Sequence, residues 1–218
     1  MATASVKTAL SQFHLDSATR FAFVCAEIER EEKHLEWPQP RMKEARSNAL
    51  AAVLLAAATI EASVNEFYQR AVDRNKNALK PLTLDQIKAL AECWPDIERL
   101  SPMRKHQIAL LETGHKPMNK GQEPYRSAKG LMSLRNALMH FKPEWDDDLT
   151  KHRSLDRQLS QLFPVSALAE GAKGEMVWFP KKCLGAGCAV WAIESAIRFN
   201  QEFVKILGIR EMLKPPLR

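Results

Sequence analysis

Arg135, Asn136 and His140 are the residues whose types and spacing best suit chemistry on a substrate, and they lie in the string Arg-Asn-Ala-Leu-Met-His. A histidine can both take up and release a proton near neutral pH. An arginine keeps its charge, and its planar guanidinium can bind two oxygens of a phosphate. Together they offer what RNA cleavage without a metal requires, namely proton transfer and a cation that stabilises negative charge at phosphorus.

Arg135 and His140 would lie about 140° apart around a helix, whereas Asn136 and His140 are four residues apart and share a face. We therefore expect the long Arg135 side chain to curl toward His140, and Asn136 to hydrogen-bond the imidazole and fix its tautomer. One arginine and one histidine are few groups for this reaction. Two copies of the chain related by a twofold axis would supply two of each, which favours a homodimer. By spacing alone, the pair also fits a surface arginine and a C-terminal histidine favoured by the helix dipole.

The segment from Arg99 to Lys142 carries a net charge of +7, against +6 for the whole chain of 218 residues. Only Glu112 and Glu123 oppose its basic residues, which are Arg99, Arg104, Lys105, Lys116, Lys120, Arg126, Lys129, Arg135 and Lys142. Such a concentration predicts a surface that attracts a polyanion such as RNA. A solvated basic face without a partner is the alternative.

Apolar residues recur every three or four positions along most of the chain, which predicts helices at 6–35, 41–77, 83–94, 101–114, 125–141 and 188–207. In the helix before Pro143, the stripe expected to face the core consists of Leu131, Leu134, Leu138 and Phe141, and His140 falls in the last turn. The predicted fold class is all-α, an antiparallel helical bundle with an irregular insertion at 142–182 before the last helix. We expect one domain over 1–218, with a loose C-terminal tail at 209–218.

No segment reaches about 18 uninterrupted apolar residues, so no membrane-spanning helix is predicted. Residues 1–7 lack the layout of a secretory signal, and we expect a cytoplasmic protein. Cys25 and Cys93 fall within helical patterns as free thiols, and the spacing of Cys183 and Cys188 is unusual for a zinc site. Neither a phosphate-binding glycine loop nor a metalloprotease motif is present, so we expect no cofactor and no metal.

The string from Ser133 to His140 resembles the signature of HEPN-domain proteins, in which an arginine, commonly followed by a polar residue, precedes a histidine after four to six positions. Residues 59–67 also resemble the long second helix of this superfamily, and residues 180–203 are similar to its closing helix. The resemblance spans about residues 10–207, and its specific part is the Arg-Asn-x-x-x-His string.

The resemblance implies a homodimer in which two motifs face each other in a cleft. It implies a metal-independent endoribonuclease, a hydrolase that acts in toxin–antitoxin systems or antiphage defence. Arg135 and His140 would be catalytic, Asn136 would support them, and Glu61 would be an acidic residue of the second helix near the site. Glu61 fits equally well as a solvated helix charge. The expected partners are RNA, a second copy of the chain, and an antitoxin or regulatory protein.

Two other functions stay open at this point. One is a non-catalytic HEPN module that pairs with a partner protein or a nucleotide, and the other is a purely structural helical protein. Non-catalytic members of the superfamily often lose the arginine or the histidine, whereas Arg135 and His140 are both intact. The insertion at 142–182 could gate the cleft, select RNA or bind an antitoxin, and the sequence does not choose among these roles.

Overall fold

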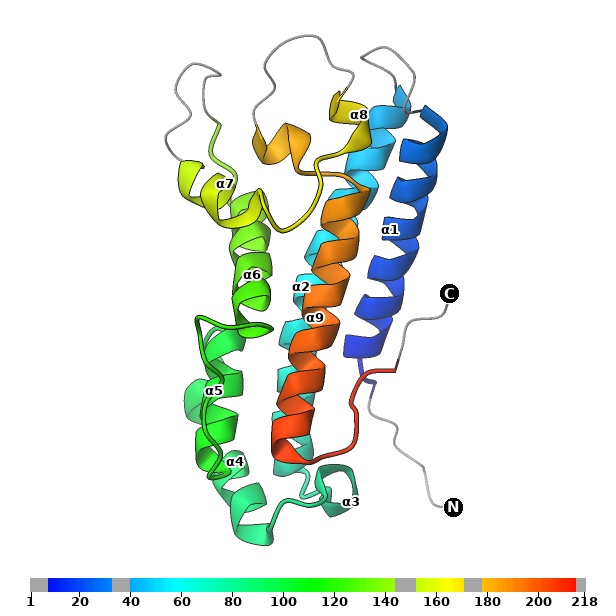
Figure 1. Cartoon of the computed structure of the whole chain (residues 1–218). Helices are drawn as coiled ribbons and strands as arrows, with labels where there is room; N and C mark the ends of the chain where they lie inside the picture. Colours follow the sequence, from blue (N-terminus) through cyan, green and yellow to red (C-terminus); the bar gives the residue numbers. More distant parts are fainter. Residues whose placement is uncertain (1–7, 33–39, 144–151, 171–177, 215–218) are drawn as a thin grey trace, which may run out of the picture.

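The computed structural model describes residues 8–32, 40–143, 152–170 and 178–214, and within these ranges every regular element is a helix. Three long helices lie side by side, namely α1 (Ser11–Glu32), α2 (Pro40–Val72) and α9 (Ala186–Leu207). A fourth column consists of α6 (Tyr125–Met139) and α5 (Pro102–Glu112), with α4 (Leu84–Ile97) at its lower end, and the short α3 (Lys76–Leu79) lies below the end of α2 (Figure 1). Because α1 and α2 run in opposite directions, as do α6 and α9, the predicted antiparallel helical bundle is confirmed.

Helix α2 lies at the centre of this bundle because the middle of the helix is rich in alanine. Small side chains let neighbouring helices approach closely, and α2 packs against α1, α4, α6 and α9. The alanines that are at most 1% exposed are Ala45, Ala49, Ala52, Ala56, Ala57 and Ala71. By length and composition α2 could also cross a membrane, since one window of 18 residues has a mean hydropathy of 1.5, although half of that window is buried inside the fold.

The N-terminus of α1 is capped by a carboxylate from α2 rather than by a residue of its own. One oxygen of Glu66 accepts hydrogen bonds from the backbone N–H groups of Leu10 and Ser11, both at 2.8 Å. The other oxygen accepts from the Ser11 hydroxyl at 2.7 Å. The first N–H groups of a helix have no partner within the helix, so Glu66 satisfies two of them and fixes where α1 begins.

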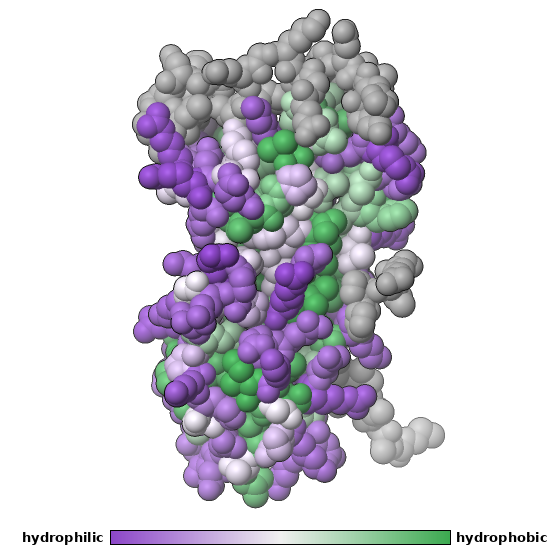
Figure 2. Space-filling view, viewed as in Figure 1, coloured by the Kyte–Doolittle hydropathy of each residue, from purple (hydrophilic) through white to green (hydrophobic). Residues whose placement is uncertain are grey.

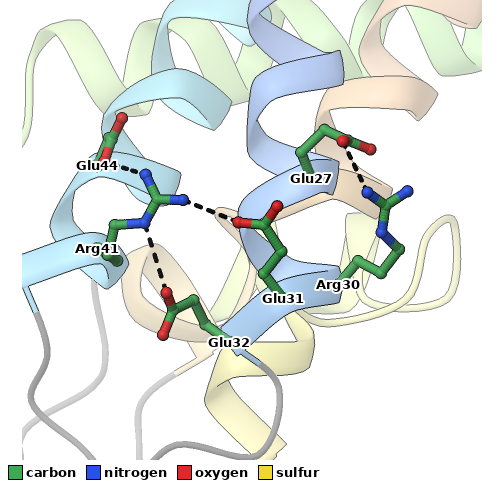
Figure 3. Close-up of polar contacts among 6 residues, drawn as sticks. All are labelled: Glu27, Arg30, Glu31, Glu32, Arg41 and Glu44. Carbon is green, nitrogen blue, oxygen red and sulfur yellow. Dashed lines mark hydrogen bonds and ion pairs between the residues drawn. The ribbon is translucent and has the colours of Figure 1, made fainter.

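The opposite end of the α1–α2 pair is joined by a cluster of ion pairs around Arg41 (Figure 3). The Arg41 guanidinium contacts Glu31 of α1 at 2.9 Å, Glu32 of α1 at 3.5 Å and Glu44 of α2 at 3.1 Å. Exposed ion pairs stabilise a fold weakly because water screens them. The cluster therefore fixes how the two helices meet more than it adds stability.

The predicted insertion contains short helical elements that lie across the upper end of the bundle in Figure 1: α7 (Arg153–Leu159), α8 (Ala167–Glu170) and η1 (Trp178–Lys182). Two buried contacts hold the segment in place. The Ser166 hydroxyl donates a short hydrogen bond to Glu29 of α1, and the Ser166 backbone N–H donates to the Lys182 carbonyl at 2.8 Å. Gly130 of α6 leaves room for α7, because a Cβ atom there would lie 2.9 Å from Leu159.

The first part of the segment expected to be a loose tail is packed against the bundle. Ile209 is buried, and Met212 and Leu213 contact the core. The Lys214 backbone N–H donates to the Gln12 side chain of α1 at 2.8 Å. The apolar side chains explain this correction, since they give residues 209–214 surface to bury, whereas residues 215–218 lie outside the described part of the chain.

On the face of the molecule shown in Figure 2, hydrophobic side chains gather along the middle, where α9 lies in Figure 1, and hydrophilic side chains occupy most of the margins. The large apolar side chains that stay exposed include Phe13 and Phe23 of α1 and Val190 of α9. Some apolar surface on α1 and α9 thus stays open to solvent, although most of the large apolar side chains are buried in one core.

One ionisable side chain is enclosed between the columns. His106 of α5 is 1% exposed, and its ring lies edge-on to Phe199 and Phe203 of α9, with 4.7 Å between ring centroids in each case. Its Nδ1 donates to the Pro102 carbonyl at 2.8 Å, while its Nε2 is buried with no hydrogen-bond partner among the described residues. Burial lowers the pKa of His106 from 6.5 to about 4, so this histidine is neutral in the folded protein at pH 7.

This burial predicts a loss of stability in mild acid. Between pH 6.5 and about 4 the unfolded chain binds a proton at His106 and the folded chain does not, so the free energy of unfolding should fall by about 2 kcal/mol from pH 7 to pH 5. Urea unfolding at the two pH values measures this difference. It should shrink in His106→Asn, whose amide can still donate to Pro102, and persist in the control His115→Asn. If the free energy of unfolding fell between pH 7 and pH 5 as much in His106→Asn as in the wild type, the loss of stability could not be assigned to His106.

Candidate functional site

Helix α6 presents the Arg135–His140 motif at its C-terminal end. Its inner face is anchored by Ala128, Leu131 and Leu134, all fully buried. The helix ends at Met139, and the backbone N–H of the next residue, His140, donates to the Asn136 carbonyl at 2.9 Å. His140 therefore caps the helix, with φ −114° and ψ 39°, directly after the last helical turn.

Arg135 connects α6 to α2. Its Nη2 atom lies 3.7 Å from the Glu61 carboxylate, and its Nη1 atom donates to the Asn136 side-chain oxygen at 3.0 Å. The Arg135 and Glu61 side chains are 35% and 40% exposed, so the pair is open to solvent on one side. Arg135 thus touches two of the other three residues singled out by the sequence, and its contact with Glu61 joins two helices that are far apart in the sequence.

His140 is the member of the motif that stands apart. Its side chain is exposed, and the imidazole makes no hydrogen bond or ion pair with any other described residue. The predicted hydrogen bond from Asn136 to the imidazole is absent, because the Asn136 oxygen binds Arg135 instead and the backbone leaves helical geometry at His140. Within the described part of the chain, the imidazole is therefore open to a substrate or a second chain.

Lys105 and Asn65 extend the polar cluster formed by Arg135, Asn136 and Glu61, and neither was predicted from the sequence as a site residue. Lys105 was expected among the surface cations, yet it is 2% exposed, and its Nζ atom donates to the Asn65 side-chain oxygen at 2.7 Å. The ammonium also lies 5.2 Å from the centre of the Trp94 ring. Burial lowers the pKa of Lys105, and the nearby Glu61 and Glu98 carboxylates act in the opposite direction. In the sequence, Asn65 could have been found only from its position four residues after Glu61, which places both side chains on one face of a helix.

The other basic residues of the 99–142 segment are more accessible than Lys105. Arg126, in the first turn of α6, pairs at 2.9 Å with Glu123, which precedes the helix. Those classed as exposed are Arg99, Arg104, Lys116, Lys120, Arg126, Lys129 and Lys142. The charge concentration read from the sequence is therefore present at the surface of α5, α6 and the loop that joins them.

An aromatic cluster adjoins His140 on the side of the insertion. The Phe141 ring stacks on the His152 ring, with 5.6 Å between centroids and 5° between planes. Phe179 of η1 lies 4.7 Å from His152 and 6.0 Å from Phe141. Phe141 was expected on the core stripe of α6 but is 44% exposed, because the helix ends two residues earlier. The cluster fixes the insertion beside the end of the motif.

The cysteines are separate from this surface. Cys25, Cys183 and Cys188 are buried free thiols, and burial raises the pKa of Cys25 to about 12. A thiol with so high a pKa is a poor nucleophile. Within the described residues no three His, Cys, Asp or Glu side chains are grouped so that they could hold a metal ion.

The end of α6 thus offers a guanidinium held by a carboxylate and an amide, with an exposed imidazole five residues further along the chain. This combination can bind a phosphate and move a proton. No family model, curated protein or solved structure matches the chain. These side chains, and the resemblance of their motif to the HEPN signature, are therefore the features of the chain that point to a function.

Proposed function

We propose that the protein is a metal-independent endoribonuclease of the HEPN type. The observation that carries the proposal is the contact of Arg135 with both Glu61 and Asn136. Residues picked out by the motif and by the resemblance to the HEPN superfamily gather at one surface, and the remaining one, His140, is exposed at the end of α6. This gathering supports one site with a phosphate-binding cation and a proton-transferring group.

In the proposed reaction the 2′-oxygen of RNA attacks the adjacent phosphorus and the bond to the 5′-oxygen breaks. One proton leaves the 2′-hydroxyl and one is added to the 5′-oxygen, which yields a 2′,3′-cyclic phosphate and a 5′-hydroxyl. His140 performs one of these transfers, and Arg135 binds the phosphoryl oxygens as negative charge develops on them. Glu61 and Asn136 hold the guanidinium in position.

The need for two proton transfers supports a homodimer, because each chain brings a single histidine to the motif. Apolar side chains next to His140 also support a partner at this end of α6, since Met139 is 56% exposed and Phe141 is 44% exposed. Exposed apolar side chains beside a polar site are a common feature of interfaces. Two copies would supply an acid, a base and two guanidinium groups in one cleft.

The surface cations of the 99–142 segment support RNA as the substrate. Exposed lysine and arginine side chains attract the phosphate backbone without regard to sequence. The resemblance also supports a role as a toxin or an antiphage-defence effector in the cytoplasm. An antitoxin or regulatory protein would then restrain the enzyme.

The first test is cleavage of single-stranded RNA in the presence of EDTA. Arg135→Ala and His140→Ala should each lower the rate by roughly 10²- to 10⁴-fold, the range expected for the loss of an acid–base or charge-stabilising group. Arg198→Ala and His115→Ala remove the same residue types elsewhere, since Arg198 is an exposed arginine of α9 outside the 99–142 segment, and both variants should cut RNA at the wild-type rate. Circular dichroism checks that all four variants are folded. Persistent cleavage by both motif variants would contradict the proposal, and tight ligand binding without any cleavage would favour a non-catalytic adaptor.

The second test asks whether the active site is shared between two chains. At saturating RNA, an excess of His140→Ala should suppress the activity of the wild type, because a mixed dimer keeps only one of the two histidines that the two proton transfers need. Analytical ultracentrifugation of the wild type should give the mass of a dimer. A fully active monomer, or wild-type activity that the excess of His140→Ala leaves unchanged, would exclude the shared site.

A further inference from the structure

The buried ammonium of Lys105 is the feature that the proposed reaction leaves unexplained. Transfer of a charged amine from water into a protein is costly unless hydrogen bonds or opposite charges compensate it. Lys105 is 2% exposed, and its one side-chain hydrogen bond among the described residues goes to Asn65. An apolar residue would fill the same space without this cost, which points to a role for the contact itself.

The contact fixes the orientation of the Asn65 amide. An ammonium group has only donors, so it can bind the oxygen of an amide and not the nitrogen. With its Oδ1 held by Lys105 at 2.7 Å, Asn65 must turn its NH₂ group away from the buried side. Asn65 is partly exposed, and no acceptor among the described residues binds its Nδ2. The amide therefore presents two unused hydrogen-bond donors toward solvent.

These donors lie next to the proposed active site. Asn65 is one helical turn beyond Glu61 on the same face of α2, and the Glu61 carboxylate contacts Arg135 at 3.7 Å. The positive charges of Arg135 and Lys105 are balanced by the nearby carboxylates of Glu61 and Glu98. The surface beyond Arg135 thus combines a guanidinium with a neutral donor of fixed orientation, a combination that suits a phosphate oxygen.

We propose that Asn65 binds a phosphate oxygen of the RNA strand beside the scissile phosphate, and that Lys105 is the positioning residue that turns its amide outward. This inference rests on the proposed function, because it needs RNA at Arg135. It adds a subsite that the motif does not contain. The buried lysine acts through Asn65 and does not touch the substrate.

Asn65→Asp separates this role from a structural one. An aspartate keeps an oxygen for Lys105 and removes the NH₂ donors, so the variant should unfold at or above the wild-type temperature. Its affinity for a short single-stranded RNA with 2′-fluoro groups, which cannot be cleaved, should fall by about tenfold. Gln69→Glu adds the same charge one turn further along α2 and should lower the affinity by less than about twofold.

Lys105→Met is the second variant of this test. It removes the ammonium that holds the Asn65 oxygen, so the Asn65 amide can rotate. It should weaken RNA binding, and its effect should not add to that of Asn65→Asp, since both act through one side chain. If wild-type protein cuts and binds RNA while Asn65→Asp binds like Gln69→Glu, the subsite is refuted and the proposed function stands. If wild-type protein neither binds nor cuts RNA, both fail.

Discussion

The close packing of helices around the alanine-rich middle of α2 is the constraint on which the rest of the structure depends. With Ala49, Ala52 and Ala56 fully buried, α1, α6 and α9 can all approach the same helix. The polar residues that follow this stretch on α2 then lie within reach of side chains from α5 and α6. A larger side chain in the middle of α2 would push these helices apart and separate Glu61 from Arg135.

This geometry explains why the candidate site is built across elements rather than within the motif. Arg135 is held by Glu61 from α2, and Lys105 from α5 holds Asn65 from the same face of α2. The Arg135–Glu61 pair is open to solvent and adds little to the stability of the bundle. The effect of both contacts is to fix the direction of two cations and one amide, which is what the binding of a phosphate requires.

The helical pattern of the sequence was sufficient to predict the fold class, because the apolar stripes have helical spacing over the long elements. Local endings were less predictable. The second helix was expected to reach residue 77, but α2 ends at Val72, followed closely by Arg74 with φ 53°, which breaks the helical backbone. The resemblance to the HEPN superfamily also implied that Glu61 lies near the site, although a solvated helix charge fitted Glu61 equally well. The residue types did not predict that Lys105 is buried, because its burial depends on how the helices pack. Nor did they predict that Asn136 binds Arg135 rather than His140, because that depends on where α6 ends.

The central claim is that this surface breaks RNA by transfer to the neighbouring 2′-oxygen, without a metal ion. The most direct measurement is the chemical identity of the new ends when purified wild-type protein cuts RNA in EDTA. The account predicts a 2′,3′-cyclic phosphate on one fragment and a 5′-hydroxyl on the other. Fragments with a 3′-hydroxyl and a 5′-phosphate, or cleavage that appears only when a divalent cation is added, would contradict it.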